Sequence, residues 1–303
     1  MSTPLRIGIE IGGTKQQIVA GDEQGNIVDR CRFSTDPKAN ASEIQNRIAE
    51  ELTKLIATHQ PERIGVGFGG PVDITQGMVA TSHQIEGWSG FPLADWLRDL
   101  SGLPIIIEND SNCAALAEAL RGAGRGFDPA FYMNMGSGVG GGLVIDGKIY
   151  HGDCPGEVEV GHLRLDTTGT TVEDRCSGWA VDHAIREAVK TNPDCPLAQL
   201  LGVETGGEAK HLAEALAQDD STAQGILETV TRDLAFALSH VVHLFHPQVI
   251  ILGGGLSLVG APLRKSIEKQ LPQFLMETYG DGPEIKLTEL GEDAVPAGAL
   301  LME

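Results

Sequence analysis

Short apolar runs alternate along this chain with glycine-rich turns and with longer segments of helical periodicity. Residues 6–11, 16–20 and 26–33 have the composition of strands and are separated by short turns, which predicts a β-meander. Residues 41–58 then carry apolar side chains at a helical period. Because strands and helices continue to alternate, we expect an α/β fold.

The second half of the chain repeats this order of elements. Residues 130–135 form an apolar strand, a glycine turn follows at 136–141, and strands return at 142–145 and from 149. A single glycine turn is a weak signal, but two copies in the same setting are a stronger one. We therefore expect two related α/β domains, each with a glycine turn.

Both turns have the composition of a phosphate-binding loop. The first contains Gly12, Gly13, Thr14 and Lys15, and the second places Ser137 among glycines. Glycines leave backbone N–H groups open to a nearby anion, while hydroxyl and ammonium groups add donors. An ordinary glycine hairpin has the same composition, so each turn alone supports either interpretation. Together they would hold the phosphates of a nucleotide from both sides.

An acidic stretch follows the apolar run at 103–107 and precedes an alanine-rich helical segment, residues 113–120. Asp110 therefore falls at the carboxyl end of a strand, where open α/β sheets bind their ligands. A carboxylate there can accept a hydroxyl proton as a general base. The alternative is that Asp110 or Ser111 only caps the helix.

Three other segments offer groups to a ligand. The turn at 69–71 could line a pocket with backbone or be a plain loop. Glu159 and His162 could hydrogen-bond sugar hydroxyls, although the alternation there also fits an edge strand with solvent-facing acids. Residues 253–255 permit flat contact with a planar group such as adenine, or close packing of a helix.

Three histidines, His240, His243 and His246, lie near the end of a long apolar helical segment. Their spacing permits a metal site, but histidines near a helix C-terminus also complement the helix dipole. No carboxylate accompanies them, and Pro247 ends the helix. We favour the dipole interpretation.

Composition and charge narrow the class of protein. The 303 residues include 22 Lys and Arg against 42 Asp and Glu, a net charge of −20 that argues against nucleic-acid binding. Five cysteines, without CxxC spacing, do not suggest a disulfide framework. We find no signal-peptide pattern and no apolar run of membrane-spanning length, so we expect a cytoplasmic protein with no membrane partner.

The ordered set of motifs resembles the ROK family, which contains bacterial sugar kinases and sugar-responsive repressors. The resemblance runs over essentially the whole chain, and its order and spacing make it specific. The matching stretches are 10–15, 69–73, 108–112, 136–142, 159–162, 253–255 and 294–300.

The resemblance implies a two-domain actin-like ATPase fold, of the ribonuclease H-like type, with a duplicated β-meander plus helices. The smaller domain would comprise residues 1–116 and 291–303, and the larger one residues 117–290. Members phosphorylate hexoses or related amino sugars with Mg-ATP, so ATP and Mg²⁺ are the implied cofactors. Dimers are common in the family, which makes a homodimer the expected assembly.

The resemblance also assigns roles by position. Asp110 would be the catalytic base and would contact the substrate. The other implied sugar-binding residues are Gly70, His83, Asn109, Glu159, His162 and Asp182. The implied nucleotide-binding residues are Glu10, Gly12, Gly13, Thr14 and Lys15 in the first turn, Gly136, Ser137 and Gly138 in the second, and Gly254 and Gly255 facing adenosine.

The chain departs from the family pattern at three places. Glu10 stands where the family usually has Asp, which keeps the charge but adds a methylene group. Residues 82–84 replace a usual Asn, with His83 in that region. The family's zinc-binding cysteine cluster is reduced to Cys176, so we predict no structural zinc and no other resident metal. Asp182 would replace the Glu at the end of that cluster.

We therefore interpret the chain as a glucokinase-like enzyme that transfers phosphate from ATP to a sugar hydroxyl. A non-catalytic sugar-binding or regulatory relative is the alternative from another class. The first phosphate strand begins almost at the N-terminus, without a DNA-binding segment before it, which argues against a repressor. An acyl-phosphate-forming kinase fits less well, because Asn109, Glu159 and His162 suit a neutral polyhydroxylated substrate.

Overall fold

The computed structural model describes residues 4–13, 15–34, 40–82, 87–153, 156, 158–202 and 206–303. Their contacts divide the chain into two compact units. The first unit contains residues 1–125, 142–157 and 292–303, and the second contains residues 126–141 and 158–291. The expected division differs chiefly in that it left residues 142–157 with the second half.

The first unit is built on a five-stranded sheet in the order β3-β2-β1-β4-β7. Its strands are β1 (Arg6–Ile11), β2 (Lys15–Gly21), β3 (Ile27–Ser34), β4 (Ile64–Phe68) and β7 (Ile105–Asn109). The first three form the predicted antiparallel meander, and β4 and β7 continue parallel to β1. A two-stranded ribbon, β5 (Val72–Asp73) and β6 (Met78–Val79), follows β4.

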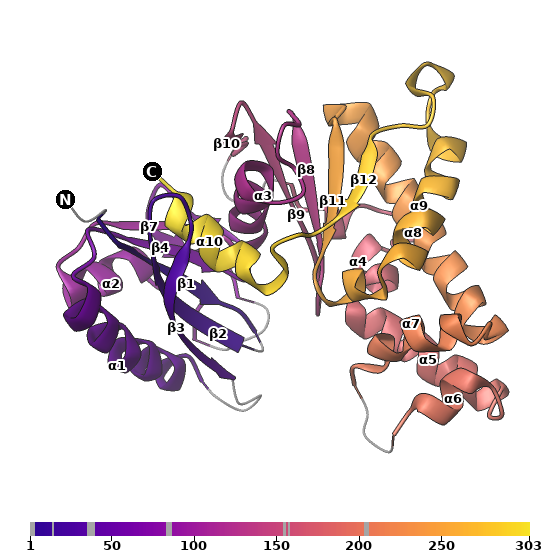
Figure 1. The fold of residues 1–303 in the computed structure, drawn as a ribbon, viewed down its shortest axis with the longest axis horizontal. Coiled ribbons are helices and arrows are strands. Elements are labelled where there is room, and N and C mark those ends of the chain that lie inside the picture. Colours follow the sequence, from indigo (N-terminus) through magenta and orange to yellow (C-terminus); the bar gives the residue numbers. More distant parts are fainter. Residues whose placement is uncertain are drawn as a thin grey trace. The chain divides into compact units, whose positions relative to one another are not determined.

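Helices cover both faces of this sheet, as Figure 1 shows. On one face lie α1 (Ala41–His59) and α2 (Leu93–Ser101), and on the other lie α3 (Asp110–Arg121) and α10 (Ala294–Leu301). The helix α10 packs so closely that a Cβ atom on Gly65 would lie 1.9 Å from the Ala299 carbonyl oxygen. Glycine at position 65 is therefore a condition for this packing.

The second sheet repeats the topology of the first, in the order β10-β9-β8-β11-β12. Its strands are β8 (Ala130–Met135), β9 (Val139–Ile145), β10 (Lys148–Ile149), β11 (Val249–Gly253) and β12 (Glu284–Leu287). As in the first sheet, three meander strands are followed by two parallel ones. The predicted duplication is confirmed.

The second unit is otherwise helical. Its helices are α4 (Val172–Cys176), α5 (Gly178–Thr191), α6 (Pro196–Leu200), α7 (Leu212–Ala217), α8 (Ser221–Phe245) and α9 (Ala261–Gln270), with short 3₁₀ turns between them. The long helix α8 packs against α4, α5, α7 and α9, which explains its apolar composition. Among the described residues, none of the helices has the length and apolarity needed to cross a membrane.

Candidate functional site

Asp110 lies where the sequence indicated, as the first residue of α3 and directly after β7. The capping alternative is wrong, because the Asn109 side chain caps this helix. Its Oδ1 atom accepts hydrogen bonds from the backbone N–H groups of Ser111 at 2.8 Å and Asn112 at 3.3 Å. Helix capping by the Asp110 side chain therefore does not explain why an aspartate occupies position 110.

The Asn109 amide also joins two elements of the site. Its Nδ2 atom donates to the Gly70 carbonyl at 3.2 Å, so the turn after β4 is tied to the start of α3. Gly70 has a φ of +155°, which glycine adopts readily. Both ends of the Asn109 amide are thus engaged with the protein's own backbone.

Gly69 lies between Asp110 and the first glycine turn. A Cβ atom on Gly69 would lie 3.4 Å from Asp110 Oδ2 and 3.5 Å from the Gly12 Cα atom. The missing side chain therefore leaves Asp110 and the start of the turn facing the same small space.

The first glycine turn closes the β1–β2 hairpin. The Gly12 N–H donates to the Lys15 carbonyl at 3.1 Å, and the Gln16 side chain donates to the Gly12 carbonyl at 2.8 Å. Gly13 lies within the turn, and Thr14 falls outside the described residues. These hydrogen bonds hold the two ends of the turn next to the buried Glu10.

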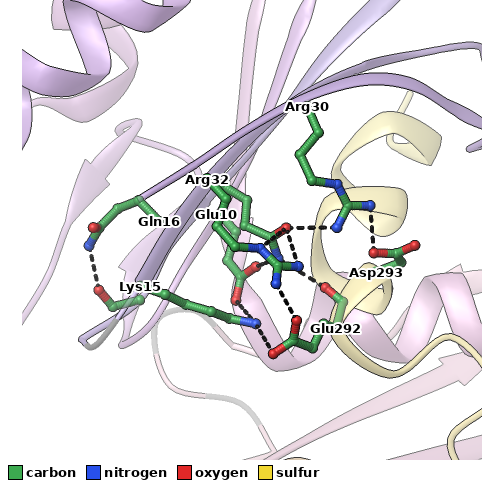
Figure 2. A network of polar contacts seen from close by, with 9 residues as sticks. Glu10, Lys15, Gln16, Arg30, Arg32, Glu292 and Asp293 are labelled. Carbon is green, nitrogen blue, oxygen red and sulfur yellow. Dashed lines mark hydrogen bonds and ion pairs between the residues drawn. The ribbon is translucent and has the colours of Figure 1, made fainter. Parts of the chain in front are cut away.

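A network of charges surrounds this turn, as Figure 2 shows. The Lys15 ammonium lies 3.8 Å from Glu10 and 3.5 Å from Glu292. Arg32 pairs with Glu292 at 2.6 Å, and Arg30 pairs with Asp293 at 2.6 Å. Two adjacent acids just before α10 are therefore bound to the meander that carries the turn, Glu292 to β2 and β3 and Asp293 to β3.

Gln17 is the centre of this network. It faces Glu10 across the strand pair and donates to that carboxylate at 2.6 Å, while its Oε1 atom accepts from Arg30 and Arg32. Burial raises the pKa of Glu10, and the Lys15 ammonium and the Gln17 amide act in the opposite direction. The Lys15 ammonium lowers the pKa of Glu292.

Our sequence analysis missed Gln17, Arg30, Arg32, Glu292 and Asp293. Arg30 and Arg32 are two residues apart in β3, so their side chains lie on the same face of the strand. This spacing was the pattern in the sequence that could have indicated a common binding partner. Their acidic partners, Asp293 and Glu292, lie more than 250 residues away, so no local pattern pairs them.

The second glycine turn lies between β8 and β9, and hydrogen bonds of its backbone groups hold it in place. The Gly136 carbonyl accepts from the Gly178 N–H at 2.7 Å, and the Val139 N–H donates to Glu173 Oε2 at 2.8 Å. A Cβ atom on Gly138 would lie 2.5 Å from that same carboxylate oxygen. Glycine at 138 therefore lets Glu173 approach the turn, which also contains Ser137.

Gly254 and Gly255 follow β11, next to the end of β8. Gly254 has a φ of +76°, and a Cβ atom there would lie 2.5 Å from the Met135 backbone. Among the described residues, and apart from its two chain neighbours, no heavy atom lies within 4 Å of a Cβ atom added to Gly255. Close chain packing thus accounts for the first of these glycines but not for the second.

Glu159 and His162 belong to a compact turn and not to the edge strand that the alternation of residues also permitted. Val160–His162 is a 3₁₀ turn, and its first carbonyl acceptor is Glu159. A Cβ atom on Gly161 would lie 2.1 Å from the Val139 carbonyl oxygen, so this turn is pressed against the start of β9. Glu159 and His162 therefore flank the strand that leaves the second glycine turn.

Asp182 is buried in α5, where its carboxylate stabilises a neighbouring turn. Its two carboxylate oxygens accept from the backbone N–H groups of Gly207 at 2.8 Å and Ala209 at 2.7 Å. These bonds hold the start of the 3₁₀ turn Glu208–His211. His83, the remaining predicted sugar ligand, lies outside the described residues.

The histidine series of α8 is engaged in ring contacts. His240 packs on Phe236 with ring centroids 4.8 Å apart, and His243 and His246 both contact Tyr279.

Cys176 is buried and donates to the Val230 carbonyl, and burial raises the pKa of its thiol. Within the described ranges, no three His, Cys, Asp or Glu side chains gather as a metal-binding group.

Known proteins resemble this chain over nearly its full length. The ROK family model matches residues 6–303. A glucokinase of Halalkalibacterium halodurans is 30% identical, with 97% of this chain and 93% of the relative covered. The DNA-binding transcriptional repressor Mlc of Escherichia coli is 26% identical, with 85% of this chain and 66% of the repressor covered.

Among solved structures, a ROK family glucokinase of Streptomyces griseus, in complex with glucose and AMPPNP, is similar with a TM-score of 0.86. It is 30% identical, and 98% of each chain is covered. The duplicated sheets described above have the actin-like ATPase fold of these ROK sugar kinases. The chain belongs to the ROK family.

Proposed function

We propose that this protein is an ATP-dependent sugar kinase of the glucokinase type. The observation that carries the proposal is the position of Asp110. This carboxylate follows the edge strand β7 and faces, across the missing side chain of Gly69, the start of the first glycine turn. A base next to a phosphate-binding turn is the arrangement that transfer of a phosphoryl group to a hydroxyl requires.

In this mechanism the two glycine turns bind and orient the phosphates of ATP. Lys15 exchanges part of its contact with Glu10 and Glu292 for a phosphate oxygen. Magnesium carried with ATP would neutralise part of the charge on the phosphates. Asp110 orients the attacking sugar hydroxyl and accepts its proton as the new bond to phosphorus forms.

Sugar recognition is assigned to Gly70, Asn109, Glu159 and His162. Asn109 already bonds Gly70 and the α3 backbone, so it would contribute a preorganised surface and not a freely rotating amide. Asp182 is not included, because its carboxylate already accepts two backbone N–H groups. We expect the enzyme to act in the cytoplasm as a homodimer, and light scattering would test the assembly.

A non-catalytic sugar sensor is the second candidate. The similarity to the repressor Mlc favours it, because that relative has a different activity within the same family. A sensor would bind sugar without consuming ATP.

One experiment separates the two. The purified protein is incubated with Mg-ATP and a panel of hexoses and N-acetylated amino sugars, and ADP release is measured for the wild type and Asp110→Asn. Sugar-dependent release that the substitution abolishes supports the kinase. Sugar binding without ADP release from any member of the panel would refute it.

A further inference from the structure

Glu108 is a buried carboxylate two residues before the proposed base, and only 3% of its surface is exposed. A buried carboxylate is costly unless hydrogen-bond donors surround it. Three donors do so here. The Asn109 N–H lies 2.7 Å from Oε1, the Asn112 side chain lies 3.0 Å from Oε1, and His151 Nε2 lies 2.5 Å from Oε2.

Two of these donors flank Asp110 in the chain. Asn109 precedes it and caps α3, and Asn112 lies in the first turn of the same helix. Glu108 therefore holds the end of β7 and the first turn of α3 together, with Asp110 between them. The position of the base depends on where this buried carboxylate lies.

The third donor comes from a distant segment. His151 follows β10, and its side chain lies 43 residues from Glu108 in sequence. The chain leading to it is pressed on α3, because a Cβ atom on Gly142 would lie 2.6 Å from the Ala115 side chain and 2.8 Å from the Ser111 carbonyl oxygen. When the carboxylate is ionised it can only accept, and the pair then requires the proton on His151 Nε2.

We infer that His151 is a positioning residue for the phosphoryl-transfer step, which acts through Glu108 to hold Asp110 in place. This inference rests on the proposed kinase activity. His151 anchors one side of the Glu108 carboxylate, while the α3 turn anchors the other. Loss of the anchor lets the carboxylate, and with it the start of α3, shift from the geometry that the attacking hydroxyl needs.

The test compares His151→Leu, which removes the donor, with His151→Gln, whose amide can still donate to Glu108. The readouts are kcat and the KM for Mg-ATP, with the sugar that supports ADP release in the wild type. We expect His151→Leu to lower kcat roughly 10-fold while the KM for ATP changes less than about two-fold, because a displaced base impairs the reaction more than nucleotide binding. The Gln variant restores most of kcat.

A second pair of variants separates positioning from general damage to the fold. In the Asp110→Asn background, His151→Leu should cause no further loss, because its effect passes through the base. Glu108→Gln should lower kcat like His151→Leu, and serves in its place if the Leu variant fails to fold. An equal kcat for wild type and a folded His151→Leu overturns the inference and leaves the kinase proposal intact. A wild type that releases no ADP with any sugar overturns both.

Discussion

The two glycine turns occupy equivalent places in two sheets of the same topology, yet their surroundings differ. Lys15, Glu10 and Glu292 bring charges to the first turn. The second is held by a backbone hydrogen bond from Gly178 and by the Glu173 carboxylate, which accepts from Val139. Duplication of the topology thus conserves the place of a turn, while the side chains around it, from the meander and from segments outside it, determine its chemistry.

The last strands of the two sheets also differ. In the first sheet, β7 ends at Asn109 and leads directly into the helix that begins with Asp110. In the second sheet, the corresponding strand β12 ends at Leu287, and the next residue donates its N–H to the Leu252 carbonyl. We therefore expect the base to act from the first unit alone, and the predictions below test this asymmetry.

The largest expected effect concerns the two carboxylates next to the turns. Asp110→Asn should lower kcat by about 10²- to 10⁴-fold, since it removes a general base. Nucleotide binding, measured by calorimetry, should be retained. Glu173→Gln is the matched substitution at the second turn and should change kcat by less than about three-fold, because an amide oxygen can still accept from Val139. Comparable losses in both variants would contradict the asymmetry.

The next comparison is between two neighbouring glycines after β11, Gly254 and Gly255. Gly254→Ala should lower the free energy of unfolding by about 1–3 kcal/mol, because it forces a positive φ on alanine and a contact with the Met135 backbone. Gly255→Ala should change it by less than about 0.5 kcal/mol. Urea denaturation measures both values.

The same pair tests the adenosine assignment. If a planar base lies on Gly255, the Gly255→Ala variant should raise the KM for ATP while its unfolding midpoint stays that of the wild type. An unchanged KM would remove Gly255 from the nucleotide site.

The donors of the two turns should contribute unequally to ATP binding. Lys15→Met should raise the KM for ATP by about 10-fold or more, because it removes a charged donor, whereas Ser137→Ala removes a neutral hydroxyl and should raise it by about three-fold. Initial rates at saturating sugar measure both. A larger effect at Ser137 would show that the second turn dominates phosphate binding.

The smallest expected effect is the pH dependence of stability at Glu10. Its pKa is higher in the folded protein than the ordinary value of 4.5, because the group is buried. Such a group destabilises the folded state increasingly as the pH rises from 4.5 through the folded-state pKa. The free energy of unfolding of Glu10→Gln, relative to the wild type, should therefore increase over this interval and then level off.

Glu292 provides a control of opposite sign. The Lys15 ammonium lowers the pKa of Glu292, so its ionised form stabilises the folded protein above the ordinary pKa and this contribution is lost on acidification. Relative to the wild type, Glu292→Gln should lose stability as the pH rises from about 3 to 5. Parallel slopes for the two variants would contradict the assigned shifts.

Local sequence patterns determined much of the architecture. The strand, glycine turn, strand order at 6–33 recurred at 130–150, and both copies formed the predicted meanders. The position of Asp110 between the end of a strand and the start of a helix was also predicted correctly, although β7 is a half-buried edge strand and not a buried one. These features depend on backbone preferences and on the periodicity of burial, which neighbouring residues determine.

Only the tertiary structure decided what the polar side chains near these elements do. Asn109, and not Asp110 or Ser111, caps α3, and Asp182 accepts from the backbone of a turn some 25 residues further along. Glu292 reaches Lys15, and His151 reaches Glu108, from distant parts of the chain. Several residues in each stretch have suitable chemistry, and the choice among them depends on which remote segment packs against that surface.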